Sequence, residues 1–483
     1  MYLGLDLGTS GLKAVLIDDD QNAIASAHSD LNVDRPQSGW SQQDPAEWVA
    51  ACEAVLGALG GKADLSAVKG IGMSGQMHGA TALAADESVL YPSILWNDTR
   101  SANEAAAMDS APAFRSISGN IVFPGFTAPK VAWLKAHEPE LAERIACVLL
   151  PKDYLRLWLT GDKVSEMSDA AGTSWLDTGA RDWSDELLSK TGLTRDHMPR
   201  LVEGSERSGD LRADLASRFG LPAGIPVAGG GGDNAASAIG IGAVRPGEGF
   251  LSLGTSGVLF VSNEAYRPDP ATAVHTFCHA VPDTWHQMGV ILAATDALAW
   301  YGKLVGEDPA DLTGRLGELK APGGTCFLPY LGGERTPLND AAIRGAFVGL
   351  EHATDRDVGT RAIMDGVAFA MRDCHEALAG TGTTIEHLIA VGGGSRSRIW
   401  LEAMATVLGS AIHVPADGDL GGAFGAARLG LMAATGAGLD VVTTPETADV
   451  IEPNQTLQSA YEDAYAGYKA ALTAIQNLPG GSQ

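Results

Sequence analysis

The heptapeptide Leu5-Asp6-Leu7-Gly8-Thr9-Ser10-Gly11 opens the chain, and Leu251-Ser252-Leu253-Gly254-Thr255-Ser256-Gly257 repeats its pattern 246 residues later (254 minus 8). In both copies an apolar run precedes the Gly-Thr-Ser turn and another apolar run follows it. Two such runs joined by a short turn predict a β-hairpin. The sequence therefore predicts two copies of one hairpin, and with them a duplicated fold.

A second pattern follows each hairpin, in which an apolar strand leads into a glycine run and then into a helix. The segments are 225–228, 229–232 and 233–241 in the first half, and 388–391, 392–394 and about 396–408 in the second half. Because the order is the same in both halves, we expect the two glycine runs to be structural counterparts. Strands that alternate with helices predict an α/β sheet in each half.

The turn-like stretch Val244-Arg245-Pro246-Gly247 separates the two halves. We therefore expect a first domain over residues 1–245 and a second over residues 246–483, with a cleft between them. The first half carries a long insertion between its hairpin and its glycine run. Insertions on a common scaffold often carry specificity.

The composition restricts the possible partners. The chain has 483 residues and a formal charge of -26, and a field of that sign repels the phosphate backbone of nucleic acids. The same field opposes a phosphorylated ligand unless a cation or aimed backbone N–H groups are present. Five scattered cysteines without a Cys-x-x-Cys pair indicate free thiols in a reducing compartment. With no leader-like segment and no long apolar run, we expect a cytoplasmic protein without a membrane partner.

Each hairpin turn offers hydroxyl side chains and exposed N–H groups, which together form an anion-binding nest. Two such turns that face each other across a cleft could hold the β- and γ-phosphates of a nucleotide. Asp6, beside the first turn, is placed to hold Mg²⁺ directly or through water, although an ordinary strand-end acid is the alternative interpretation. The chain has no Gly-x-x-x-x-Gly-Lys-[Ser/Thr] sequence, so a P-loop is not supported.

Taken in order, several short motifs resemble the FGGY family of carbohydrate kinases, over nearly the whole chain from Tyr2 to about Leu429. The motifs are Asp6-Leu7-Gly8-Thr9-Ser10, Gly75-Gln76-Met77-His78-Gly79, Asp233-Asn234, Tyr330-Leu331-Gly332-Gly333-Glu334-Arg335-Thr336-Pro337 and Gly392-Gly393-Gly394. One departure is Leu420-Gly421-Gly422-Ala423, where relatives often have a different residue at Gly422, and we assign no specific contact there.

The resemblance implies two duplicated ribonuclease-H-like domains, as in the actin and hexokinase superfamily, that close on ATP and Mg²⁺. It further implies transfer of the γ-phosphoryl group to the terminal hydroxyl of a ketopentose in pentose catabolism. The Gly-Gln-Met-His-Gly motif favours D-xylulose over glycerol as the acceptor. The resemblance to the family as a whole also implies a homodimer.

Asp233 follows four glycines at the start of a helix, where the helix N-terminus favours its ionised form. With the resemblance, Asp233 is the expected general base and a second metal ligand beside Asp6. Taken alone, it is best explained as a helix N-cap. The residues expected to bind the sugar are Gln76, Met77, His78, Asp153, Asp233 and Asn234.

The nucleotide is expected to contact both hairpins and the second glycine run, which can lie flat against adenine and ribose. The expected contacts are Gly8, Thr9, Ser10, Lys13, Gly254, Thr255, Ser256, Gly393, Gly394 and Ser395. Two alternatives stay open: a kinase for another ketopentose or a pentitol, and, more distantly, an ATP-driven clamp of the actin or heat-shock type that binds protein.

Overall fold

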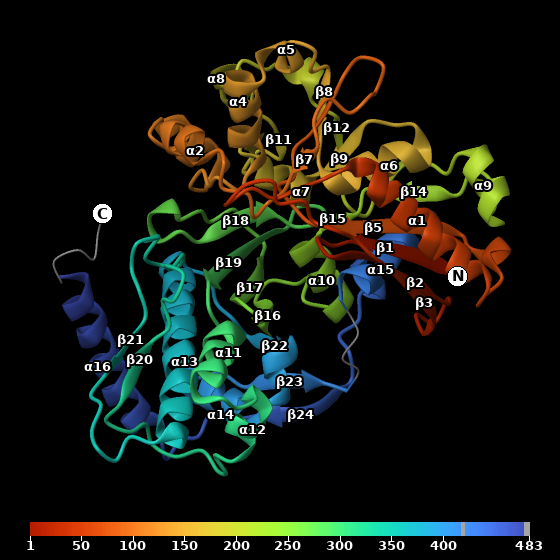
Figure 1. Ribbon diagram of the computed structural model, residues 1–483. Helices are drawn as coiled ribbons and strands as arrows, with labels where there is room; N and C mark the ends of the chain where they lie inside the picture. The colour runs from red at the N-terminus through yellow and green to blue at the C-terminus, as the bar shows by residue number, and fades with distance from the viewer. Residues whose placement is uncertain (417–420, 478–483) are drawn as a thin grey trace.

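Both predicted hairpins are present in the computed structural model, which describes residues 1–416 and 421–477. In the first, β1 (Tyr2–Leu7) pairs antiparallel with β2 (Gly11–Ile17), and in the second, β16 (Glu248–Leu253) pairs antiparallel with β17 (Gly257–Asn263). Each hairpin forms the middle of its own seven-stranded sheet (Figure 1). The duplicated α/β fold that the sequence predicts is therefore confirmed.

The first sheet joins antiparallel and parallel pairs. In spatial order its strands are β13 (Arg207–Asp210), β14 (Pro226–Ala228), β5 (Gly70–Gly75), β1, β2 and β3 (Ala23–Asp30), with the short β15 (Gly231–Gly232) also beside β5. Strands β1, β5 and β14 run parallel, whereas β2, β3 and β13 run antiparallel to their neighbours. Helix α1 (Pro45–Gly60) packs on β2 and β3 and buries the indole of Trp48.

The second sheet has the same arrangement around its own hairpin. Its order is β18 (His275–Cys278), β19 (Trp285–Ile291), β17, β16, β22 (His387–Val391), β23 (Ile412–Pro415) and β24 (Thr447–Ile451). Strands β16, β22 and β23 run parallel, and the others run antiparallel. Helix α13 (Arg356–Gly380) packs on β17 and β19. The helices around α13 are α11 (Thr295–Val305), α12 (Pro309–Gly314), α14 (Arg398–Leu408) and α16 (Gln458–Gln476).

The strand order corrects the expected pairing of the two glycine runs. Strand β5 lies directly beside β1, and β22 lies directly beside β16, so the chain after β5 is the counterpart of residues 392–394. The strand before residues 229–232 is β14, one place further out, and its counterpart is β23. Both glycine runs follow a parallel strand and have similar sequences. Local sequence therefore could not show that the two strands occupy different positions in their sheets.

Helix α10 (Asp233–Ile241) follows β14, and its counterpart α15 (Gly422–Thr435) follows β23. These two helices pack against each other, and α15 also covers β1 and β5 of the first sheet (Figure 1). An ideal Cβ on Gly425 would lie 1.8 Å from Ala236 O, and one on Gly72 of β5 would lie 1.7 Å from Ala426 O. Only glycine permits such close backbone approach, so α15 is fitted tightly between α10 and the first sheet.

The insertion of the first half forms a layer of short elements between β5 and β13. Its strands are β6 (Thr81–Leu83), β7 (Ser93–Ile94), β8 (Cys147–Leu149), β9 (Val164–Glu166), β10 (Leu176–Asp177), β11 (Asp182–Trp183) and β12 (Arg200–Val202). Its helices are α2 (Ala102–Asp109), α3 (Pro112–Ser118), α4 (Thr127–His137), α5 (Pro139–Ala142), α6 (Pro151–Thr160), α7 (Met167–Ala170) and α8 (Asp185–Lys190). The remaining elements are β4 (Gln42–Gln43), α9 (Ala213–Phe219), β20 (Cys326–Leu328) and β21 (Ala346–Val348).

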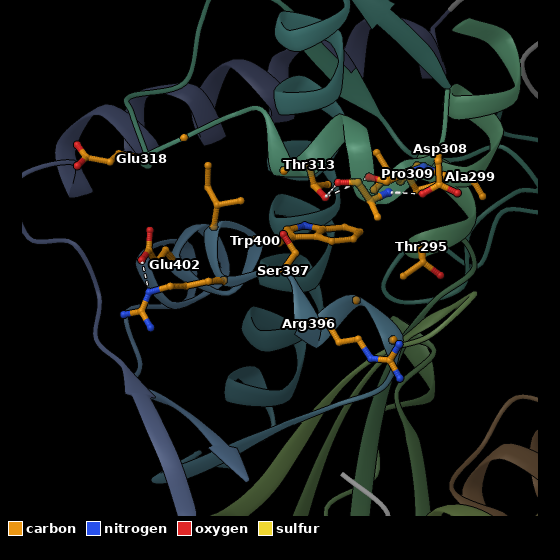
Figure 2. Close-up of a pocket in the computed structure, with 18 residues that line it drawn as sticks. Thr295, Ala299, Asp308, Pro309, Thr313, Glu318, Arg396, Ser397, Trp400 and Glu402 are labelled. Atoms are coloured by element: carbon orange, nitrogen blue, oxygen red, sulfur yellow. Dashed lines mark hydrogen bonds and ion pairs between the residues drawn. The ribbon is translucent and has the colours of Figure 1, made fainter. Parts of the chain in front are cut away.

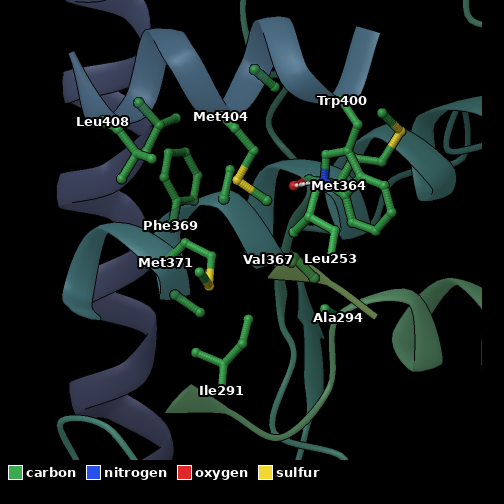
Figure 3. Close-up of a cluster of buried hydrophobic side chains, with 14 of the residues drawn as sticks. Leu253, Ile291, Ala294, Met364, Val367, Phe369, Met371, Trp400, Met404 and Leu408 are labelled. Carbon is green, nitrogen blue, oxygen red and sulfur yellow. Dashed lines mark hydrogen bonds between the residues drawn. The ribbon is translucent and has the colours of Figure 1, made fainter. Parts of the chain in front are cut away.

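Apolar side chains of both halves join in one cluster, in which Met77 and Phe126 of the first half pack with Phe277 and Phe260 of the second. The second half also has a separate core between α13 and α14, where Trp400 Nε1 donates to Met364 O at 3.1 Å (Figure 3). No helix among the described residues is both long and apolar enough to cross a bilayer. Leu420 lies outside the described residues.

Candidate active site

Asp6 lies near the end of β1, directly opposite Lys13 on β2. An ideal Cβ on Gly422 would lie 2.9 Å from Asp6 Oδ2, so the first turn of α15 touches this carboxylate. Burial raises the pKa of Asp6, and the Ser74 hydroxyl and the charge of Lys13 oppose that rise. The positive end of α15 also favours a negative group at this place. Lys13, expected to contact the nucleotide, therefore stands beside the candidate metal ligand.

Asp233 is the first residue of α10, and the N-cap position is occupied by Gly232. Asp233 Oδ1 accepts two hydrogen bonds from Asn234, at 2.7 Å from the backbone N and 2.9 Å from Nδ2. No described side chain or backbone group donates to Oδ2. The local alternative, in which Asp233 serves only as an N-cap, is therefore wrong.

The carboxyl group of Asp233 is reached by solvent although protein surrounds it on several sides. That crowding, and secondly the charge of Asp6, raise the pKa of Asp233 to about 6, against the hydrogen bonds from Asn234. Both the solvent contact and the raised pKa fit a carboxylate in an open recess: water reaches it, but the surrounding protein leaves it less solvated than in bulk water. The influence of Asp6 means that the two acids predicted to share a metal ion lie in one electrostatic environment.

The turn of the first hairpin is held by polar side chains. Thr9 Oγ1 donates to Gln76 Oε1 at 3.1 Å and accepts from Trp96 Nε1 at 2.9 Å. Gln43 Nε2 donates to Thr9 O at 2.8 Å, and Gln76 Nε2 donates to Gln43 Oε1 at 3.1 Å. Gln76 is buried, so this residue, expected among the sugar contacts, braces the turn. Ser10 remains exposed at the tip of the turn.

His78 has a φ of +70°, an uncommon value for a residue other than glycine and one that often marks a functional position. Its Nδ1 lies 2.7 Å from Gly172 O, and its ring stacks on Phe126 with 4.5 Å between centroids. Burial lowers the pKa of His78 to about 3, and the nearby charges of Lys130 and Arg335 act in the same direction. The imidazole is therefore neutral at physiological pH.

The contact with Gly172 also fixes the tautomer of His78. A carbonyl oxygen only accepts hydrogen bonds, so Nδ1 must carry the proton, and Nε2 of the neutral ring is then an acceptor. The backbone of His78 is held as firmly, because its carbonyl accepts from Thr127 Oγ1 at 3.1 Å and from Lys130 Nζ at 2.8 Å. The site thus presents a fixed acceptor suited to a hydroxyl group.

Met77, the residue before His78, packs against Gly232, the residue before Asp233. An ideal Cβ on Gly232 would lie 2.8 Å from Met77 Sδ, and one on Gly172 would lie 3.1 Å from Met77 Cε. Met77 is buried at this place and supplies an apolar floor. The structure thus brings together Met77, His78, Asp233 and Asn234, which the sequence predicts as sugar-binding residues.

Asp153, expected among the same contacts, has no exposed surface and lies behind the glycine run. Its Oδ1 lies 2.7 Å from Lys152 Nζ and 2.6 Å from Arg156 Nη1. Burial alone would raise the pKa of Asp153, but the charges of Lys152 and Arg156 outweigh it, and the pKa lies below its usual value. Arg156 also donates to Gly229 O, so the charged cluster supports the backbone that leads to Asp233.

The second hairpin turn is joined to the start of α11. Thr295 N and Thr295 Oγ1 both donate to Gly254 O, at 2.9 Å and 2.7 Å, and Ala294 N donates to Thr255 O at 2.8 Å. An ideal Cβ on Gly394 would lie 3.0 Å from Thr295 Cγ2 and 2.8 Å from Leu253 Cβ. The turn, the helix start and the second glycine run are therefore neighbours, as a site for one extended nucleotide requires.

A cavity of about 930 Å³ opens beside this junction, between α11, α12 and α14 (Figure 2). Its walls include Gly393, Gly394, Thr295, Arg396 and Trp400. Ser395, expected among the nucleotide contacts, instead donates its Oγ to Gly392 O at 2.6 Å within the turn. The α12 side of the cavity, with Asp308 and Thr313, carries no motif that sequence reasoning could have found.

Sequence comparison gives matches over most of the chain. Residues 1–240 match the N-terminal domain, and residues 249–434 the C-terminal domain, of the FGGY family of carbohydrate kinases. A xylulose kinase of Escherichia coli strain K12 is 46% identical over 437 residues, covering 90% of this chain and 90% of that protein.

Solved structures of other proteins have a similar fold along nearly the full length of this chain. A protein described as a xyloylose kinase from Brucella ovis superposes with a TM-score of 0.98 at 61% identity, covering 99% of this chain and 100% of that one. A xylulose kinase from Rhodospirillum rubrum gives a TM-score of 0.92 at 29% identity, covering 98% and 99%.

Proposed function

This chain belongs to the FGGY family of carbohydrate kinases, and on that premise we propose that it phosphorylates D-xylulose to D-xylulose 5-phosphate with ATP. The observation that carries the chemistry is Asp233, an accessible carboxylate with a raised pKa beside Met77 and the fixed acceptor of His78. The choice of D-xylulose is supported by relatives named xylulose kinase that match along most of the chain.

Asp233 is assigned as the general base. Both hydrogen bonds from Asn234 end on Oδ1, so Oδ2 is available to take the proton of the terminal sugar hydroxyl. The hydroxyl oxygen then forms a bond to the γ-phosphorus, the bond from that phosphorus to the bridging oxygen breaks, and ADP leaves. Positioning and charge stabilisation supply most of the catalysis in such transfers, and a base contributes about 10²–10⁴-fold.

Asp6 and Asp233 fit the requirements of Mg²⁺, which takes one or two carboxylates together with water and phosphate oxygens. The charge of Asp6 helps to raise the pKa of Asp233, so the two carboxylates repel each other and a cation would relieve the repulsion. When bound with the nucleotide, Mg²⁺ neutralises charge on the phosphate oxygens. Lys13, opposite Asp6, adds a positive charge on the same side.

Recognition of the sugar is assigned to Met77, His78 and Asn234. His78 Nε2 accepts from a sugar hydroxyl, whereas the amide of Asn234 can both donate and accept. Asp153 acts behind them, through the glycine run that it helps to support. The cavity beside residues 393 and 394 takes the adenine and ribose, and the two hairpin turns take the phosphates.

The direct test is release of ADP from Mg-ATP with each of a panel of ketopentoses and pentitols. We expect the highest kcat/KM with D-xylulose, and a higher value with another sugar or a pentitol would overturn the substrate while keeping the kinase. ATP hydrolysis that responds to a peptide or polymer but to no sugar would favour a protein-binding clamp.

Two further parts of the proposal concern the cellular compartment and the oligomeric state of the protein. Five cysteines without a disulfide agree with a reducing cytoplasm. The homodimer implied by the resemblance is tested by light scattering of the purified chain.

A further inference from the structure

The loop around Arg335 in the second half is clamped on both sides of that residue. Glu334 Oε1 accepts from Leu292 N at 2.9 Å and from Arg335 N at 2.7 Å. Thr336 N donates to Val290 O at 3.0 Å, and Thr336 Oγ1 donates to Ala273 O at 3.1 Å. The neighbours of Arg335 thus use their side chains to fix the loop to β19 and the chain before β18.

From this clamped loop the side chain of Arg335 extends toward the aromatic rings of His275 and Phe123. Arg335 Nη1 lies 3.3 Å from His275 Nε2, and the guanidinium stands 4.6 Å from the centre of the Phe123 ring. Burial lowers the pKa of Arg335, and the charge of Glu334 opposes that effect. The guanidinium is therefore held away from bulk water, although part of the residue remains accessible.

Most hydrogen-bonding capacity of Arg335 is unused. A guanidinium has five N–H donors, and within residues 1–416 and 421–477 only the contact with His275 engages one of them. No ion pair with an Asp or Glu of those residues is formed by this side chain, whose polar contact is the one with His275. The charge of Glu334 acts on the guanidinium without touching it, and a partly buried cation with no anion in direct contact is costly unless something else satisfies its donors.

The rings around Arg335 lead directly to the sugar-binding residues of the first half. His275 lies 5.4 Å from Phe123 and 6.0 Å from Phe126, measured between ring centres. Phe126 in turn stacks on His78, and the Arg335 charge is close enough to lower the pKa of His78. The same group of rings thus contacts two side chains of opposite hydrogen-bonding character: His78, an acceptor from the first half, and Arg335, a donor from the second.

We propose that Arg335 is a sugar-binding residue, supplied by the second half to a pocket whose other polar groups come from the first. Its free N–H groups donate to oxygens of the ketose, and the hydroxyl groups of the sugar donate to His78. This inference rests on the function proposed above. Because one sugar would then be held by both halves, its binding favours their closed arrangement and so tightens the binding of the nucleotide.

The test compares the wild-type chain with Arg335→Gln and Arg335→Lys in three measurements. These are the affinity for D-xylulose by calorimetry, the affinity for a non-hydrolysable ATP analogue without sugar, and the same affinity with saturating sugar. Charge-assisted hydrogen bonds are among the stronger ones, so we expect Arg335→Gln to bind the sugar about 10- to 100-fold more weakly. Arg335→Lys should recover part of the loss, since it keeps the charge without the fork.

The nucleotide measurements separate binding from a merely structural role. Without sugar, both variants should bind the ATP analogue as the wild type does, whereas the tightening caused by sugar should shrink in Arg335→Gln. Arg344→Gln is the matched control, because Arg344 belongs to the same loop, is exposed, and among the described residues donates only to loop carbonyls.

The outcomes distinguish the two proposals. A wild-type chain that binds no D-xylulose overturns the proposed function. A wild-type chain that binds it no better than Arg335→Gln overturns only the role of Arg335. Equal losses of sugar and nucleotide affinity in both Arg335 variants, with a lowered melting temperature, would show that the residue only supports the loop and would also overturn the inference.

Discussion

Asp233 combines two properties that general bases rarely have together in water. Its raised pKa, about 6, gives the carboxylate a higher affinity for a proton than an ordinary aspartate has, while it stays mostly ionised at neutral pH. The neighbourhood that raises the pKa, and the partner Asn234 that leaves Oδ2 unoccupied, both follow from its place as the first residue of α10.

The pH dependence of the reaction should report this group. A base must be ionised to act, and the raised pKa means that protonation begins at a higher pH than for a free aspartate. We expect kcat/KM for D-xylulose to be level above about pH 7 and to fall roughly tenfold per pH unit below about pH 6. Asp233→Asn should lose about 10²–10⁴-fold in kcat and show no such limb while still binding ATP. Turnover like that of the wild type would remove Asp233 from the mechanism.

Asp153 provides the contrasting case of an acid whose charge is used structurally. We expect Asp153→Asn to lower the free energy of unfolding by about 3–5 kcal/mol, because it leaves Lys152 and Arg156 buried without their shared carboxylate. Chemical denaturation measures the loss. The control Asp214→Asn removes an exposed partner of Arg212 and should change stability by less than about 1 kcal/mol. An unchanged stability with a raised KM for sugar would instead favour direct contact.

At the scale of elements, α10 and α15 determine where the two acids stand. Helix α10 begins at Asp233, and the first turn of α15 touches Asp6. The two helices pack against each other with backbone close to backbone at Gly425. The spacing of the acids is therefore set by a helix crossing at which Gly425 has no side chain to separate the two backbones.

Adding one methyl group at this crossing should disturb catalysis at a distance. Gly425→Ala would place a Cβ 1.8 Å from Ala236 O, so one helix must move, at a cost of about 1–3 kcal/mol. We expect a lower melting temperature and a reduced kcat, because the start of α10 moves with Asp233. Gly57→Ala on the exposed side of α1 meets no atom within 4 Å and should be neutral or stabilising by up to about 1 kcal/mol. Equal effects of the two changes would contradict the crossing argument.

At the scale of the molecule, the two halves are not independent units. Helix α15 comes late in the chain, after β23, yet it covers the first sheet, where Phe424 and Leu431 pack with Tyr2, Val15 and Ile17. The two sheets lie on either side of the boundary predicted at residue 245, but helix α15, which packs on the first sheet, is encoded in the second half.

A fragment of residues 1–245 should fold poorly alone. Without α15 it exposes the apolar faces of β1 and β2, and we expect strong binding of a hydrophobic dye and weak near-ultraviolet circular dichroism compared with the whole chain. Adding a synthetic peptide of residues 417–441 should reduce the dye signal, whereas a peptide of residues 458–476 should not. A fragment that is fully native by both measurements would refute the coupling of the halves.

Local patterns in the sequence were enough to predict the duplicated hairpins, the α/β class and the likeness to a family, because strand alternation, glycine turns and a helix start are local signals. They also selected Asp6, His78 and Asp233. For Gln76 and Asp153 the local sequence indicated sugar contact but gave no sign of their burial or of their distant partners Gln43 and Lys152, so their contact with the sugar stays a prediction.

The correspondence between the two glycine runs became visible in the folded chain, since it depends on the order of strands in a sheet and not on their order in the chain. The tertiary structure likewise decided that α15 crosses to the first half, and that Arg335 stands beside the rings that lead to His78. These features arise where segments far apart in the chain pack together, because close packing selects partners by shape and burial, which no local pattern encodes.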